Sequence, residues 1–239
     1  MLFSLLQGGD PISVLISMLL SIPIIVLALS FHETAHGYVA WKCGDSTAYY
    51  MGRLTLNPLK HLDPMGLFSM LIFGYGWAKP VPVNARNFRD PKKGMALTAA
   101  AGPAANMLLG IISAVLCGFF LALYSFLFYK GISGFFLTCI YWTVVLTELS
   151  AIYNFIFMVF NLIPVPPFDG SRIALVFLPD RFYFGVMRYE RQIMLGLLIA
   201  LLILSRFDLS PFSWIAERLT YLISEPVSNL LWKLFQKAL

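Results

Sequence analysis

The chain has 239 residues, of which 59% are hydrophobic and only 12% are charged. Ordinary soluble domains have roughly 45–50% apolar and about 25% charged residues, so this composition excludes a soluble globular protein. The net charge of +5 lies in predicted loops and not on one helix face, which favours basic loops beside a lipid bilayer and argues against nucleic acid as a partner.

The first predicted element is an apolar run over residues 11–31, long enough to cross a hydrocarbon core of about 30 Å as a helix. Residues 42–93 are rich in Gly, Pro and Asn, so we expect a mainly non-helical region there. Inside it, residues 65–77 are apolar but too short to cross the bilayer, and the Pro-Val repeat of residues 79–84 favours an extended edge. Together these features predict a re-entrant, β-hairpin-like segment after the first core helix.

Two further spans are predicted over residues 95–129 and 135–163. Residues 193–204 form a shorter apolar run, which we expect to be a fourth span. Beyond it, residues 211–224 and 226–239 mix apolar and charged side chains, which is typical of interfacial amphipathic helices or of one more span.

The expected fold class is therefore an all-α polytopic membrane protein with a core of three transmembrane helices. We expect a single membrane-embedded domain over residues 1–239, with its core within 11–175 and additional C-terminal helices within 176–239. The loops 42–93 and 170–192 hold twelve of the 17 Lys and Arg residues. Positive loops face the cytoplasm, so we expect a multi-pass protein of a prokaryotic cell membrane whose active site lies towards the cytoplasmic side.

The chemistry begins at the end of the first predicted span with His32-Glu33-Thr34-Ala35-His36, an H-E-x-x-H motif. Residues four apart lie within about 40° on one face of a helix, so both imidazoles can bind one metal ion while the Glu acts on a water molecule. The alternative is a polar trio at a helix end, at the level of the lipid headgroups. Ionisable groups within apolar segments are costly, which favours the metal site.

A catalytic zinc needs a third protein ligand, and three residues are candidates. His61 lies in a polar loop, and Glu148 lies in a predicted span without a nearby chain break. Asp169 is the best candidate, because it follows three prolines that must interrupt a helix near membrane depth. Broken backbone is tolerated at that depth only where it is buried in protein or lines a wet cavity. The alternative for Asp169 is a turn-forming Asp-Gly outside the span.

These motifs resemble those of the site-2 protease family of intramembrane zinc metalloproteases. The resemblance covers most of residues 25–175, and no stretch is long and polar enough for a PDZ or CBS domain, so the chain looks like a minimal member. The segments that carry it are HETAH at 32–36, GRLTLNP at 52–58, GWAKPVPVN at 76–84, GPAAN at 102–106 and NLIPVPPFDG at 161–170.

The resemblance implies one Zn²⁺ bound by His32, His36 and Asp169, with Glu33 as the catalytic base. It also implies that Asn161 donates to the substrate carbonyl and that Asn106 is a further polar group near the substrate. For Asn106 the alternative is a helix-packing role on a surface of small residues. The implied substrate is the transmembrane helix of another membrane protein within the lipid bilayer, with an upstream protease as a possible second partner.

Other functions remain open on the sequence alone. The same His and Asp residues could line the pathway of a metal-ion transporter or channel. A non-catalytic scaffold that binds membrane helices is disfavoured, because all the expected catalytic positions are filled. A protease with Glu148 in place of Asp169 as third ligand is a further alternative.

Overall fold

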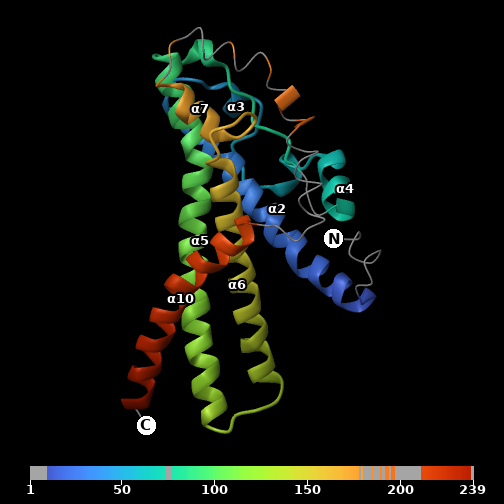
Figure 1. Cartoon of the computed structure of the whole chain (residues 1–239), viewed down its shortest axis with the longest axis vertical. Coiled ribbons are helices and arrows are strands. Elements are labelled where there is room, and N and C mark those ends of the chain that lie inside the picture. The colour runs from blue at the N-terminus through green and yellow to red at the C-terminus, as the bar shows by residue number, and fades with distance from the viewer. Residues whose placement is uncertain are drawn as a thin grey trace. The chain divides into compact units, whose positions relative to one another are not determined.

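The computed structural model describes residues 10–73, 77–177 and 211–237, with a few isolated positions between 179 and 196. The helices of these residues are α2 Pro11–Lys42, α3 Thr47–Tyr50, α4 Pro64–Phe73, α5 Pro91–Tyr129, α6 Phe135–Asn161, α7 Asp169–Leu175 and α10 Pro211–Lys237 (Figure 1). Two 3-10 turns, η1 Pro58–Lys60 and η2 Ala85–Asn87, lie between α3 and α5. The chain divides into two compact units, one of residues 1–106 with 158–210 and one of residues 107–157 with 211–239.

Three helices, α2, α5 and α6, are long and apolar enough to cross a membrane, with mean hydropathies of 2.8, 2.4 and 1.7. The predicted three-helix core is confirmed at this level. Helix α2 begins where Pro11 takes the first helical position and the Asp10 carboxylate accepts the Ser13 N–H at 2.8 Å. It continues eleven residues beyond the predicted end at Phe31, to Lys42, so the H-E-x-x-H motif lies inside the helix.

The C-terminal region forms one helix and not the two interfacial helices that were one of the predicted alternatives. Residues 211–237 form one helix, α10, which continues through Pro226, so the prediction of two separate helices there is wrong. Helix α10 is not among the three candidate spans of the described residues. The predicted fourth span at 193–204 lies almost entirely outside the described residues.

The segment between α2 and α5 is held by loop contacts and not by a sheet. No strand occurs among the described residues; the one antiparallel bridge there pairs Leu62 with Ala78, and α4 lies between these two residues. The predicted β-hairpin is therefore not confirmed, and the re-entrant path through a membrane stays a prediction. Asp45 accepts hydrogen bonds from Asn84 N at 2.7 Å and from Asn87 Nδ2 at 2.7 Å, which ties the end of this segment to the end of α2. Burial raises the pKa of Asp45, but these and the Thr47 hydrogen bonds outweigh it and lower the pKa below its usual value.

In the second unit, small residues bring helices close together. A Cβ added to Gly118 of α5 would lie 2.4 Å from the Ser224 carbonyl oxygen of α10, so the two helix backbones pack against each other with no room for a side chain at position 118. Ala216, Thr220 and Ser224, spaced by four residues along α10, are all buried. This small-x-x-x-small spacing is typical of close helix packing in membranes.

We predict that Gly118→Ala destabilises the protein. Alanine is intrinsically better than glycine in a helix by about 1 kcal/mol, so a loss of stability would come from the contact with α10 and not from propensity. Overpacking of this kind costs about 1–3 kcal/mol. The measurement is the midpoint of thermal unfolding in detergent, with Leu116→Ala at an exposed α5 position as the control. An unchanged or raised midpoint for Gly118→Ala would contradict the packing described.

Candidate metal centre

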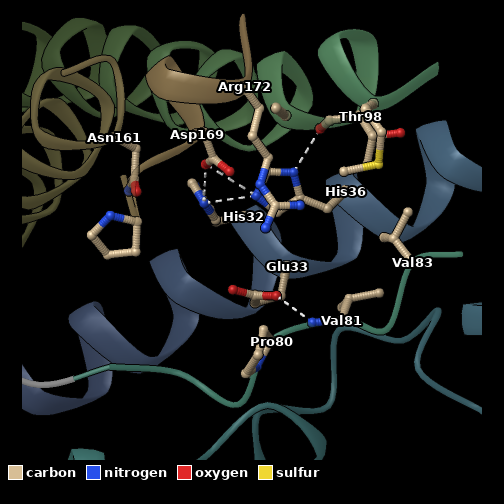
Figure 2. A pocket seen from close by; sticks show the side chains of 13 residues that line it. His32, Glu33, His36, Pro80, Val81, Val83, Thr98, Asn161, Asp169 and Arg172 are labelled. Atoms are coloured by element: carbon tan, nitrogen blue, oxygen red, sulfur yellow. Dashed lines mark hydrogen bonds and ion pairs between the residues drawn. The ribbon is translucent and has the colours of Figure 1, made fainter. Parts of the chain in front are cut away.

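Helix α2 supplies two buried imidazoles that point in one direction. His32 is 4% exposed and His36 is 9% exposed, and their Nε2 atoms lie 3.0 Å apart, as the four-residue spacing predicts. Figure 2 shows both rings turned towards Asp169. The third donor comes from the far end of this unit's sequence, since the Asp169 Oδ2 lies 3.2 Å from each of the two Nε2 atoms.

Asp169 reaches this position because the chain breaks after α6. Helix α6 ends at Asn161, and the proline-containing segment that follows leads into α7, whose first residue is Asp169. The buried Phe168 ring packs against Phe160 with the ring centroids 4.3 Å apart. The next residue has no room for a side chain, because a Cβ on Gly170 would lie 2.3 Å from the Leu162 carbonyl oxygen. The Pro-Pro-Phe-Asp-Gly sequence thus folds α7 back onto the end of α6.

The hydrogen bonds of the two histidines leave three donor atoms that fit a cation. His32 Nδ1 lies 2.6 Å from the Asn106 side-chain oxygen, and His36 Nδ1 lies 2.7 Å from the Thr98 carbonyl oxygen. In the neutral rings each Nδ1 therefore carries the proton and each Nε2 presents a lone pair. The Asp169 Oδ2 that faces them is buried and has no hydrogen-bond donor. Two imidazole lone pairs and one carboxylate oxygen, all within 4.8 Å of one another, fit a single metal ion.

A further feature agrees with a metal at this point. A Cβ added to Gly102 of α5 would lie 2.5 Å from His36 Nε2 and 2.5 Å from His32 Cε1. Glycine at position 102 therefore leaves the space in front of the ligand atoms open.

Glu33 lies in the same pocket, but among the described residues no hydrogen bond or ion pair joins it to the three ligands. Its Oε2 accepts the Val81 backbone N–H at 2.9 Å. The pocket has a volume of about 400 Å³, and Asn161 and Arg172 also line it. Figure 2 places Glu33 on the Val81 side of the histidines and Asn161 to one side of Asp169.

The remaining candidates lie elsewhere. Asn106 is fully buried and bonds His32 instead of lining the pocket, so its contact indicates a role in orienting a ligand; the predicted substrate contact stays a prediction. His61 is buried with its Nε2 2.7 Å from the Thr55 carbonyl oxygen. Glu148 accepts the Tyr221 hydroxyl at 2.9 Å within the second unit, and this contact raises the pKa of Tyr221 to about 12. Among the described residues neither His61 nor Glu148 joins the group that could hold a metal, which leaves Asp169 as the candidate third ligand.

Four residues have roles at the site that the sequence did not predict: Thr98, Gly102, Val81 and Arg172. Arg172 lies three residues after Asp169, about one turn along α7, so its spacing could have indicated that both side chains share one face of the helix. The others act through backbone atoms or through the absence of a side chain, and residue type alone carries no signal for such roles.

Comparison with known proteins supports this reading of the site. Residues 20–205 match the family model for peptidase family M50. The chain belongs to this family. Membership confirms the resemblance to site-2 proteases drawn from the motifs. No solved structure matches the chain.

Two similar proteins are informative. Over 152 residues the chain is 41% identical to "Putative zinc metalloprotease YwhC" of Bacillus subtilis (strain 168), which covers 62% of this chain and 64% of that protein. It is 30% identical over 152 residues to "Putative zinc metalloprotease Rip2" of Mycolicibacterium smegmatis, covering 61% of this chain and 52% of the relative. The chain thus spans less than two thirds of the length of both relatives.

We predict that Asn106→Ala weakens metal binding about 10- to 100-fold, because it removes the acceptor that fixes the tautomer and orientation of the His32 ring. The measurement is the affinity of the purified protein for Zn²⁺ in competition with a chromophoric chelator. Asn154→Ala is the matched control, because Asn154 is also buried but bonds the Ser150 carbonyl in the second unit. Equal affinities for the two variants would contradict the orienting role.

Proposed function

We propose that this chain is a zinc-dependent endopeptidase that hydrolyses peptide bonds within or near transmembrane segments of membrane proteins. One observation carries the proposal: the carboxylate of Glu33 opens onto the same pocket as the three converging ligand atoms of His32, His36 and Asp169. Both similar proteins are named as zinc metalloproteases, which supports zinc as the ion and peptide hydrolysis as the reaction.

The residues divide the reaction between them. When bound, a zinc ion would act as a Lewis acid towards a scissile carbonyl and a water molecule. Glu33 accepts a proton from the attacking water as the new C–O bond forms, and then gives that proton to the amide nitrogen as the C–N bond breaks. Asn161 lies on the pocket wall, and we propose that its amide N–H donates to the carbonyl oxygen as negative charge develops there.

A substrate within the membrane is supported by the place of the motif in the chain. His32, Glu33 and His36 lie in α2, one of the three helices long and apolar enough to cross a membrane. We propose that the substrate is the transmembrane helix of another protein in the bilayer, and that an upstream protease can prepare it. The basic loops at 42–93 and 170–192 support a prokaryotic cell membrane location with the pocket towards the cytoplasm.

The extended segment beside the pocket offers a way to hold an unwound substrate. Val81 and Val83 both line the pocket, and neighbouring odd positions of an extended chain direct their N–H groups to the same side. The Val81 N–H is bound by Glu33, whereas the Val83 N–H and C=O have no partner among the described residues. We propose that the substrate backbone pairs with this edge at Val83.

The first test of the function is Glu33→Gln. We expect this variant to lose at least about 100-fold in cleavage of single-span membrane proteins reconstituted with it in liposomes, because the amide cannot accept the proton. We also expect it to keep about one zinc per chain by elemental analysis, whereas His32→Ala loses the metal. If the wild-type protein binds zinc and moves it across the liposome membrane but cleaves none of the substrates, the protein is a transporter and the proposed function is wrong.

The proposed edge is tested by placing a photo-crosslinking amino acid at position 83. We expect an adduct with the substrate in the Glu33→Gln background, where the substrate binds but is not cut. The same probe at Leu59, an exposed position of η1, is the control. If the probe variant with an intact Glu33 cleaves the substrate, and the Glu33→Gln form gives no adduct at position 83, the substrate does not use this edge.

A further inference from the structure

The bond between Glu33 and Val81 joins the expected base to a distant part of the chain. The Val81 N–H donates to Glu33 Oε2 at 2.9 Å across 48 positions of sequence (Figure 2). Val81 itself is 9% exposed, and its side chain packs towards Gly37 of α2, where an added Cβ would lie 3.3 Å from Val81 Cγ1. One carboxylate oxygen is thus fixed by a backbone donor, and the other is left for a water molecule.

The donor is itself held in place from both sides. The buried Arg53 donates from Nη2 to the Lys79 carbonyl at 2.6 Å and the Pro80 carbonyl at 3.3 Å, immediately before Val81. On the far side, Asn84 N donates to Asp45 Oδ2 at 2.7 Å.

The prolines add a covalent restraint. Pro80 and Pro82 flank Val81, and a residue before proline is confined to extended conformations. The Val81 amide therefore has little freedom to follow Glu33 if the carboxylate moves, and the carboxylate must come to the amide.

We propose that the Val81 amide and Arg53 are positioning groups for the base: Arg53 fixes the backbone, and the backbone N–H fixes the rotamer of Glu33 relative to the metal ligands. This inference rests on the proposed function and adds to it two positioning groups that lie outside the H-E-x-x-H motif. A purely structural role predicts something different, since the bond would then only dock the segment on α2 and its loss would weaken substrate binding or folding without a selective loss in kcat.

The sharpest variant is Val81→Pro, which removes the N–H and keeps an extended backbone in a segment that already alternates with proline. Val81→Ala is the matched control, because it trims the side chain and keeps the donor. We expect kcat for a membrane-helix substrate to fall about 10- to 100-fold in Val81→Pro, as expected for a misplaced catalytic group, with KM within about threefold of wild type and zinc content retained. The alanine variant keeps the donor, so its kcat should fall less than that of Val81→Pro.

Arg53 gives an independent pair of variants. Arg53→Gln should lower kcat with retained zinc, and Arg53→Lys should restore part of it, because the lysine ammonium can still donate to the Lys79 or Pro80 carbonyl. Thermal unfolding in detergent separates misfolding from mispositioning. Equal kcat for Val81→Pro and Val81→Ala, or a change confined to KM, overturns the proposal.

The outcome is distinct from failure of the proposed function. If wild-type protein cleaves membrane-helix substrates and Glu33→Gln does not, the proteolytic function stands whatever the Val81 variants do. In that case a kcat of Val81→Pro equal to that of Val81→Ala removes only the positioning role.

Discussion

Three electron-pair donors that converge on one point are the constraint on which the rest of the described unit depends. Two neutral imidazoles and an ionised carboxylate repel one another unless a cation lies between them, and their donor atoms here are 3.0–3.2 Å apart. Each donor is aimed by a separate contact. The Asn106 side chain and the Thr98 carbonyl set the two rings, and the turn before α7 sets the carboxylate.

The helices around this point are shaped by what the ligands require. Gly102 leaves open the face of α5 that lies against the imidazoles, and Gly170 lets α7 return to the Leu162 carbonyl. Both positions hold glycine because a Cβ at either one would block the close approach of the neighbouring atoms. Buried polar groups in apolar helices are costly, so they occur where they bond a metal ligand or one another.

The sequence predicts those parts of the site that depend on local spacing. The four-residue interval places His32 and His36 on one face, and the prolines before Asp169 reveal a break in a helix. It does not predict contacts that depend on which faces of two helices meet. Asn106 could equally face a substrate or a histidine until the packing of α5 on α2 is known, and the Val81 amide has no side-chain signal at all. The end of α2 was also missed: the apolar run ends at Phe31 and the motif at His36, but the helix runs on to Lys42.

If a substrate pairs with Val83 as proposed, the extended segment before η2 links substrate binding to the position of Glu33. Alternate residues of an extended chain direct their N–H groups to one side, so the chain cannot offer Val83 to a substrate without also directing Val81 towards Glu33. Arg53 and Asp45 hold the two ends of that segment, and neither contacts the metal ligands. A substrate bound at Val83 would therefore be connected to Glu33 through the segment and one hydrogen bond. In the proposed function, the contacts that hold this segment also hold Glu33 in a fixed position relative to the substrate backbone.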